Sequence, residues 1–412
     1  MKTKLNLILD YFGDSKKNLF AFFFLFAVLF LMVPLSHHYD LDLFLKWGLH
    51  NYHHGISKIY IDSNTDYMPI THYLLYFFVS IQSDLSRLDI TLPLFKLIFT
   101  AIEFVFALFL LRFLKIKADW LFYLIIIILN PAFFYNSYVW GQVDSLYSFI
   151  VVVSLYLGYK NRIPTAFGMM TFALLCKFQA IFYIPILGLI ALPHFINRPI
   201  TIFWSALSII AVLFIFTAPL ESPFAIIDIM KNSVDRYPFP TVNAFNIWFL
   251  FETKPVLMDL GAIKDTDPFL GLNYKIYGYI LFFTASFFAL LPLLKKAWSN
   301  ILTKTYTFSY ELIALSGALV ALNFFYFLTQ MHERYCHTCI FFIIIYCFSK
   351  KKYLIYTLFS YAYLANLVHI YNFFKFENVG TFVFHPILIS ILFGTVLILL
   401  FKELYKNHYK IG

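Results

Sequence analysis

Residues 19–35 read Leu-Phe-Ala-Phe-Phe-Phe-Leu-Phe-Ala-Val-Leu-Phe-Leu-Met-Val-Pro-Leu, an unbroken apolar run. Lys16 and Lys17 precede the run, and a polar Ser-His-His sequence follows it at residues 36–38. No small-x-small cleavage site ends the run, so we predict an uncleaved first membrane span rather than a signal peptide. The lipid bilayer is therefore expected to determine the fold.

The composition of all 412 residues agrees with this interpretation. Hydrophobic residues make up 61% of the chain and aromatic residues 22%, only 13% are charged, and the mean hydropathy is +0.76. Soluble domains carry about 45–50% apolar and about 25% charged residues. A soluble enzyme, a disordered chain and a fibrous protein are therefore excluded. Because the apolar runs are continuous rather than alternating, we predict an all-α polytopic membrane protein and not a β-barrel.

Twelve apolar runs are interpreted as transmembrane helices, each of which needs about 20 apolar residues. They lie at residues 19–35, 92–111, 120–136, 140–158, 163–176, 178–193, 200–218, 276–294, 309–329, 335–349, 353–372 and 383–401. The stretch 70–81 is shorter and has polar neighbours, including Asp66 and Asp84, so it is predicted to be an interfacial helix. Residues 1–412 are expected to form one transmembrane domain.

The distribution of positive charge predicts which side of the membrane each loop faces. With 12 spans and a cytoplasmic N-terminus, the inner segments hold 19 of the 31 Lys and Arg residues. An excess of Lys and Arg is typical of cytoplasmic loops. The net charge of +9 is therefore attributed to topology and not to nucleic-acid binding. On this topology the long segments 36–91 and 219–275 face outward.

The region 163–193 is about ten residues too short for two full membrane crossings. The helices on either side of Lys177 are therefore predicted to stop below the outer surface. Irregular backbone at that depth is tolerated where it lines a protein cavity. We expect an outward-open cavity floored by Lys177 and Gln179; a lysine that snorkels to the membrane surface is the alternative.

The first outer loop begins with Asp40-Leu41-Asp42, and Trp47 follows. Two carboxylates just beyond a span can bind a metal ion or act as a general base. A solvated loop start explains a bare D-x-D pattern equally well. Six of the 12 histidines also lie in this loop, but their spacing matches no metal triad, so interfacial and hydrogen-bonding roles are predicted.

Polar residues also interrupt the apolar pattern at the outer ends of other spans. Gln142 and Asp144 lie between two apolar runs, where helix capping alone does not explain both of them. Arg236 precedes a Pro-Phe-Pro turn, and its guanidinium group matches the geometry of a phosphate. The strongest cluster is Gln330-Met331-His332-Glu333-Arg334-Tyr335, which interrupts an apolar hairpin.

Four of these residues are predicted to form one cationic pocket that faces several carboxylates: Lys177, Arg236, His332 and Arg334. Such a pocket suits a negatively charged, lipid-borne leaving group that meets a nucleophile. The cysteines do not point to a competing metal site. Cys336 and Cys339 form a C-x-x-C pair without a second pair of ligands, so small apolar residues on a helix face are favoured over zinc.

Taken in order, these motifs resemble the GT-C superfamily of polyprenyl-phosphate-sugar-dependent glycosyltransferases. The first-loop motif of Asp40, Asp42 and Trp47 resembles D-x-E-x-x-x-x-W in the dolichyl-phosphate-glucose-dependent glucosyltransferases of N-glycan assembly. Its D-x-D form resembles the first mannosyltransferase of GPI-anchor synthesis. The sequence Asp66-Tyr67-Met68-Pro69-Ile70-Thr71 resembles the D-Y-P-P-L-T of the glucosyltransferases.

The later motifs extend the resemblance over residues 19–349. Lys177-Phe178-Gln179 resembles a K-Q-containing helix start, and Arg236-Tyr237-Pro238-Phe239 resembles the arginine-containing loop of the glucosyltransferases. His332-Glu333-Arg334 stands where they have H-E-K, with arginine in place of lysine. The junction at residues 140–144 is similar to bacterial members of the superfamily.

The resemblance implies an inverting hexosyltransferase, with a mannosyltransferase preferred over a glucosyltransferase. Its partners would be a polyprenyl-phosphate-linked sugar donor, a glycan or lipid-linked acceptor, and membrane lipids. No metal or other cofactor is expected. The implied location is the bacterial inner membrane, with the active site facing the periplasm or exterior. A flippase or transporter for lipid-linked sugars is the alternative, although no inverted repeat is evident.

The resemblance also implies a role for each site residue. Asp40 would be the catalytic base that takes the proton of the acceptor hydroxyl. Donor-phosphate binding is assigned to Lys177, Arg236, His332 and Arg334. Catalytic support is assigned to Asp42, Asp66 and Glu333. Sugar or acceptor binding is assigned to Trp47, Gln142, Asp144 and Gln179.

Overall fold

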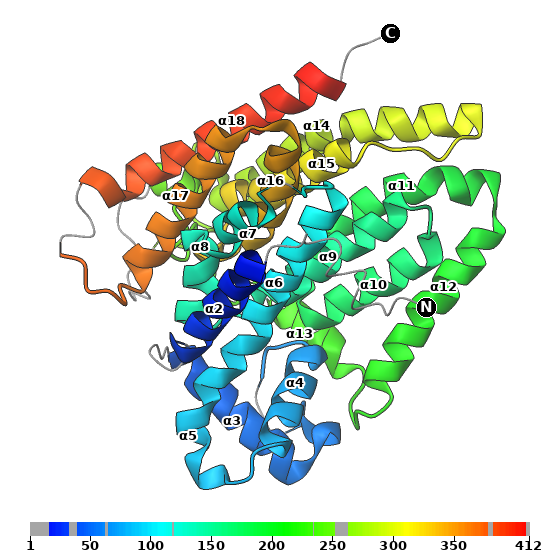
Figure 1. Cartoon of the computed structure of the whole chain (residues 1–412). Coiled ribbons are helices and arrows are strands. Elements are labelled where there is room, and N and C mark those ends of the chain that lie inside the picture. Colours follow the sequence, from blue (N-terminus) through cyan, green and yellow to red (C-terminus); the bar gives the residue numbers. More distant parts are fainter. Residues whose placement is uncertain are drawn as a thin grey trace.

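The computed structural model describes residues 16–32, 39–61, 65–117, 119–233, 235–251, 263–377 and 382–408. These residues are mostly α-helical (Figure 1). The strands among them are the short antiparallel pair β1 (Pro268–Phe269) and β2 (Leu272–Asn273). Helices satisfy every backbone polar group within one segment, which is what a bilayer demands of a spanning chain. The predicted all-α class is confirmed at this level.

Each of the twelve predicted apolar runs overlaps at least one helix. The helices of the N-terminal half are α2 (Lys16–Met32), α3 (Tyr39–His54), α4 (Pro69–Ser80), α5 (Leu88–Thr91), α6 (Lys96–Phe113), α7 (Trp120–Ile128), α8 (Pro131–Phe133), α9 (Asp144–Tyr159), α10 (Ile163–Cys176) and α11 (Ile184–Asn197). Those of the C-terminal half are α12 (Ile200–Thr217), α13 (Ala225–Ser233), α14 (Tyr274–Thr303), α15 (Tyr310–Phe327), α16 (His337–Lys350), α17 (Tyr353–Ile370) and α18 (Pro386–His408).

Shorter helical turns join these elements. The 3-10 turns are η2 (Ile56–Lys58), η3 (Leu85–Arg87), η4 (Leu92–Phe95), η6 (Phe178–Tyr183), η7 (Ile247–Leu250) and η8 (Phe382–Phe384). Residues Phe134–Trp140 (η5) form a π-helix, which ends at Gly141 with a left-handed backbone (φ 87°). π-helical turns are rare and occur frequently at functional sites.

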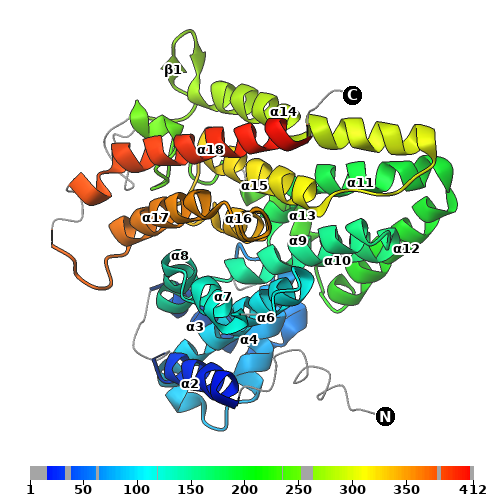
Figure 2. The same cartoon turned by 45° about the horizontal axis from the view of Figure 1, so that its top comes forward.

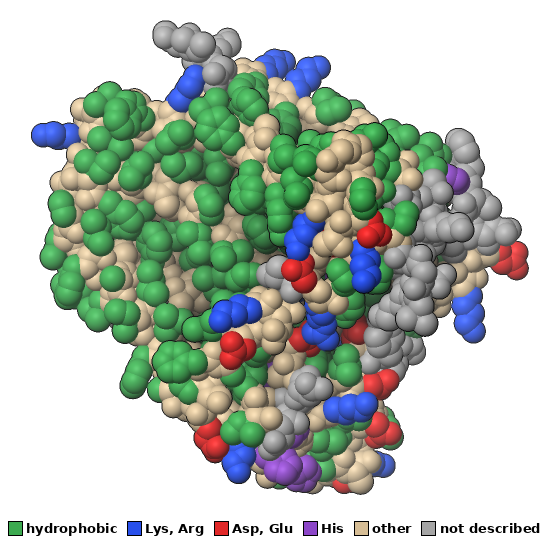
Figure 3. All heavy atoms as spheres, turned by 180° about the vertical axis from the view of Figure 1, so that it is seen from behind, with side chains coloured by type: hydrophobic (Ala, Val, Ile, Leu, Met, Phe, Trp, Pro, Cys, Tyr) green, Lys and Arg blue, Asp and Glu red, His purple; other side chains and the backbone are tan. Residues whose placement is uncertain are grey.

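Six of the helices in the described ranges are long and apolar enough to cross a membrane, and a seventh is added if a pair bent by 42° counts as one span. The six are Leu85–Phe113, Phe178–Asn197, Ile200–Thr217, Tyr274–Thr303, Tyr310–Phe327 and Pro386–His408. Figure 3 shows a broad hydrophobic face, with most charged side chains gathered below it, beside it and at its upper edge. These features indicate a membrane protein, whereas the count of twelve spans stays a prediction.

The centre of the molecule is built around α15, which lies among α14, α16 and α18 (Figure 2). In the spanning window of α15, 83% of the residues are buried, whereas in that of α12 only 6% are. Small residues of α15 such as Gly317 and Ala318 are buried against neighbouring helices. Small side chains allow close helix contacts in membranes, which explains why α15 is central although α12 is the more apolar helix.

Helices α3, α4 and α5 gather at one end of the molecule, away from α18 (Figure 1). The stretch predicted as an interfacial helix is helical, as α4. Pro69 occupies its first turn, where the missing N–H of proline costs nothing because that group would be unpaired anyway. Helix α4 also contacts α10, the helix that ends beside Lys177.

The predicted interruption at Lys177 is present. α10 ends at Cys176, Lys177 has an extended backbone (φ −159°, ψ 131°), and the tight turn η6 leads into α11. With 14 residues, α10 is about 21 Å long, which is shorter than a bilayer core of about 30 Å. Lys177 is therefore held at the end of a short helix and not on a continuous one.

Candidate functional site

A cavity of about 300 Å³ opens beside the break at Lys177. Lys177 and Gln179 both line it, as expected from the short helices around them. All four residues of the predicted cationic pocket line this one cavity: Lys177, Arg236, His332 and Arg334. The rest of the wall is largely aromatic and aliphatic, with contributions from Phe178, Phe182, Phe282, Phe283, Phe324 and Leu328. The cavity lining thus combines charged side chains with apolar ones.

Lys177 is held by one ion pair and two aromatic rings. Its Nζ forms an ion pair with Asp144, which is the first residue of α9. A carboxylate is favourable there because the helix N-terminus carries partial positive charge. The ammonium group also lies 5.6 Å from the ring centroid of Tyr147 and 5.3 Å from that of Tyr335. Burial lowers the pKa of Lys177, and the charge of Asp144 opposes that shift.

The loop between α15 and α16 supplies His332, Glu333 and Arg334. Arg334 Nη1 lies 2.9 Å from Glu333 Oε1, and its guanidinium carbon lies 5.9 Å from the ring centroid of Trp140. Burial raises the pKa of Glu333, an effect that the charge of Arg334 opposes. Burial also lowers the pKa of His332 well below its ordinary value, and the nearby Arg334 and Lys177 add to this. His332 is therefore a neutral hydrogen-bonding group at pH 7 and not a fourth cation of the cavity wall.

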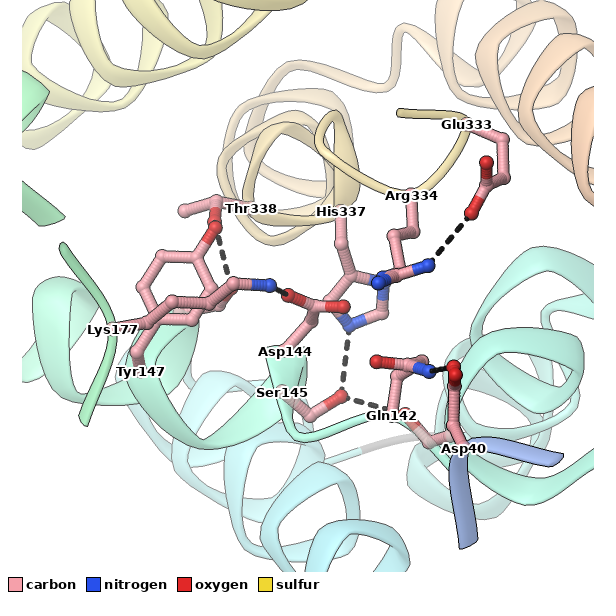
Figure 4. A network of polar contacts seen from close by, with 12 residues as sticks. Asp40, Gln142, Asp144, Ser145, Tyr147, Lys177, Glu333, Arg334, His337 and Thr338 are labelled. Atoms are coloured by element: carbon pink, nitrogen blue, oxygen red, sulfur yellow. Dashed lines mark hydrogen bonds and ion pairs between the residues drawn. The ribbon is translucent and has the colours of Figure 1, made fainter. Parts of the chain in front are cut away.

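Asp40 occupies the first turn of α3 and is 8% exposed. Its Oδ2 accepts a hydrogen bond from Trp140 Nε1 (3.1 Å) and another from the side-chain amide of Gln142. Two donors on one carboxylate oxygen stabilise the ionised form and fix its direction. Asp40 does not line the cavity itself, but its charge adds to that of Glu333 in raising the pKa of the cavity residue Arg334. Figure 4 shows Asp40 and Gln142 beneath the Glu333–Arg334 pair.

The remaining predicted residues occupy different environments. Asp42 is exposed, about 200° around α3 from Asp40, because successive residues of an α-helix are about 100° apart. Trp47 is buried and packs against Tyr67, with ring centroids 5.0 Å apart. Asp66 forms an ion pair with Arg236. The structure thus brings Asp66 to the cavity but leaves Asp42 and Trp47 away from it.

A second buried network lies directly behind Asp144, and the sequence interpretation did not identify it. Ser145 Oγ donates a hydrogen bond to Glu103 Oε1 (2.5 Å) and lies 2.8 Å from His337 Nε2. His337 Nδ1 in turn lies 3.0 Å from Tyr363 Oη. The network joins α6, α9, α16 and α17 and fixes the first turn of α9, which carries Asp144. The sequence does indicate this network, because Glu103 and His337 are ionisable residues within apolar runs and such residues are functional candidates.

Three buried polar atoms around the cluster accept or donate no hydrogen bond within the described ranges. They are Gln142 Oε1, Asp144 Oδ2 and Arg334 Nε. Buried polar groups are nearly always paired with protein, water or ligand. Of these three residues Arg334 lines the cavity, so a ligand oxygen in the cavity is able to pair with its Nε, which makes this cluster the leading candidate for a binding site.

The two cysteines of the C-x-x-C pair do not line the cavity. Cys336 and Cys339 are buried free thiols at the start of α16, and Cys339 Sγ lies 3.3 Å from the carbonyl oxygen of Ala318. Among the residues that the structure describes, no three His, Cys, Asp or Glu side chains come together as metal ligands. The helix-face interpretation of the C-x-x-C pair fits this environment.

Comparison with known proteins gives no assignment: no family model matches the chain, and no curated protein matches it.

Proposed function

We propose that this protein is an inverting glycosyltransferase with a GT-C fold of about twelve spans. It would move a hexose, mannose or glucose, from a polyprenyl phosphate to a hydroxyl group of a lipid-linked or extracytoplasmic glycan acceptor. The observation that supports this most strongly is the single cavity lined by Lys177, Arg236, His332 and Arg334, with the buried carboxylate of Asp40 behind it. The proposed location is the bacterial inner membrane, with the site on the periplasmic or exterior side.

In the proposed reaction the acceptor oxygen attacks the anomeric carbon of the donor sugar, and Asp40 takes the acceptor proton. The bond between the anomeric carbon and the phosphate oxygen breaks, and the electron pair leaves with the lipid phosphate. Attack opposite to the leaving phosphate inverts the configuration of the sugar. No proton donor to the leaving group is needed, because fixed positive charge stabilises a departing phosphate.

The contacts of the cluster suit these roles. Trp140 and Gln142 donate hydrogen bonds to the Asp40 carboxylate and orient it, as a general base requires. Arg334 and Lys177 are cations on the cavity wall with side chains only 16% and 15% exposed, and the low local polarity strengthens their effect on a phosphate. His332, being neutral, would donate a hydrogen bond from its ring N–H group to the phosphate and would add no positive charge.

The apolar residues that line the same cavity support a lipid-borne donor. Phe178 and Phe182 lie on η6, and Phe282 and Phe283 lie on α14. Phe283 is 65% exposed, so this wall reaches the outer surface of α14. An isoprenoid chain could lie along these rings while its phosphate contacts the cations. A free nucleotide-sugar has no apolar part that would use such a wall.

Reconstitution tests the proposal. The purified protein would be placed in liposomes with polyprenyl-phosphate mannose or glucose and a panel of lipid-linked acceptors. The expected result is stoichiometric release of polyprenyl phosphate with elongation of the acceptor, unaffected by a metal chelator. Movement of the donor between leaflets without release of polyprenyl phosphate would instead indicate a transporter and would overturn the proposed activity.

A further inference from the structure

Every charged cation on the cavity wall already has a carboxylate partner. The pairs are Lys177–Asp144, Arg334–Glu333 and Arg236–Asp66. A phosphate that binds in this cavity therefore does not meet unpaired positive charge. It has to share a cation with a carboxylate or displace one.

The three pairs differ in how much water surrounds them. The Lys177 and Asp144 side chains are 15% and 1% exposed, and those of Arg334 and Glu333 are 16% and 2% exposed. Removing one partner from a buried pair is strongly unfavourable because it strands a charge away from water. Arg236 and Asp66, in contrast, are 44% and 41% exposed. A solvated pair of this kind contributes little net free energy and exchanges partners at small cost.

The exposed pair also faces the ligand space. Asp66 precedes α4 and Arg236 follows α13, so the pair links two long segments that are far apart in the sequence. Both side chains line the cavity. The guanidinium carbon of Arg236 lies 5.6 Å from the ring centroid of Tyr237, and the ion pair with Asp66 directs its N–H groups. A guanidinium group binds carboxylate and phosphate with the same fork of N–H donors.

We propose that Asp66 is a displaceable counter-ion: its carboxylate occupies, on Arg236, the position that a phosphate ester takes when it binds. The inference rests on the proposed function, since it concerns the phosphate site of that reaction. Asp66 would then lower the affinity of the cavity for phosphate esters. By returning to Arg236 it would also favour release of the lipid-phosphate product.

Loss of the Asp66 carboxylate should strengthen the binding of phosphate, although Asp66 is a residue of the cavity wall. Asp66→Asn should tighten the Kd for a phosphate ester by about two- to fivefold, which is the range expected when an exposed ion pair no longer competes. The gain should shrink at 1 M salt, where the screening length falls to roughly 3 Å. Asp66→Glu, which keeps the charge, should bind like the unaltered protein.

The test is calorimetric titration of the full-length protein in detergent with farnesyl phosphate, inorganic phosphate and uncharged farnesol. Asp228→Asn is the matched control, because Asp228 forms an exposed pair with Lys231 and does not line the cavity. Asp66→Asn should tighten binding of both phosphates and leave farnesol unchanged. Tighter binding of farnesyl phosphate than of inorganic phosphate would assign the natural ligand to lipid phosphates, and equal binding would contradict that assignment.

A double variant tests whether Asp66 competes with phosphate for Arg236 or instead supports the structure of the site. Arg236→Gln should weaken phosphate binding, and adding Asp66→Asn to it should restore less than Asp66→Asn gains in the unaltered protein, because no guanidinium group remains for the two anions to compete for. Unchanged or weaker binding by Asp66→Asn in a protein with normal thermal unfolding would overturn the counter-ion role while leaving the phosphate site intact. Absence of phosphate binding in the unaltered protein would overturn the proposed function together with this inference.

Discussion

The first turn of α3 and the loop at residues 330–335 both contribute charged groups to the cluster, but to different extents. In α3, Asp40 is buried and hydrogen-bonded, whereas Asp42 is exposed. The period of an α-helix turns residues two apart to nearly opposite sides. The helix therefore delivers one of its two carboxylates to the cluster.

The loop delivers three consecutive residues. His332 and Arg334 line the cavity, and Glu333 is buried between them. Two hydrogen bonds hold the backbone of this loop. Gln330 N–H donates to Phe239 O (3.0 Å), and Val242 N–H donates to Met331 O (2.9 Å). An irregular backbone has no fixed period, so adjacent side chains can serve one site. More residues of the loop than of the helix are therefore expected to act in the site.

The largest effect is expected from Asp40→Asn. Asparagine keeps the size of the side chain and an oxygen that accepts hydrogen bonds from Trp140 and Gln142, but it cannot take a proton at neutral pH. Single-turnover sugar transfer should fall by about 10²–10⁴-fold, as for loss of a general base. Donor binding, measured by titration, should change little. A loss explained wholly by weaker donor binding would remove Asp40 from the chemistry.

Arg334→Met tests the loop. Loss of one preorganised charge from the leaving phosphate should reduce transfer by about 10²–10³-fold, and donor binding should also weaken. Because this substitution strands the buried Glu333 carboxylate without its cation, the fold itself can suffer.

The double variant Glu333→Gln/Arg334→Met removes both charges and serves as the control for folding. It should unfold at nearly the same temperature as the unaltered protein yet remain as impaired as Arg334→Met. Normal transfer by this folded double variant would show that the loop is structural.

The burial of His332 gives a stability effect with a definite sign. Its pKa is well below 6.5 in the folded state, so the unfolded state binds the extra proton when the pH falls below about 6.5. Stability should therefore be lost between pH 7.5 and pH 5.5, by about 1 kcal/mol for this residue. His332→Gln should flatten this part of the pH dependence of the denaturation midpoint in detergent. The exposed His53→Gln is the control and should leave the slope unchanged.

The sequence was sufficient to predict which motifs meet in the cavity. Lys177, Arg236, His332 and Arg334 all lie outside the apolar runs, and all four line the cavity. It was not sufficient to predict which side chains of a motif point inward. Residues 39–42 were interpreted as a loop start, but they begin α3, and helix periodicity then separates Asp40 from Asp42.

The sequence interpretation also missed ionisable residues that lie inside the apolar runs. Glu103 lies within the run 92–111 and His337 within 335–349, so neither stood out as a motif, although both are ionisable. Their partnership through Ser145 depends on how α6, α9 and α16 pack, and hydropathy does not encode helix order. For the same reason Trp47, predicted to bind sugar, packs instead against Tyr67 and His72.

The smallest effect is expected from Asp42→Asn, and it decides whether the comparison between helix and loop is correct. Asp42 is exposed on α3, so replacing its carboxylate should change transfer by no more than about twofold, as for most surface substitutions. If the D-x-D pattern instead held a metal ion through both carboxylates, Asp40→Asn and Asp42→Asn would be equally damaging and a chelator would abolish transfer. If Asp42 were the base, its loss would exceed that of Asp40→Asn. Single-turnover transfer by both variants, measured side by side with and without chelator, distinguishes these cases. A large loss only in Asp40→Asn is the pattern that a helix with one inward carboxylate requires.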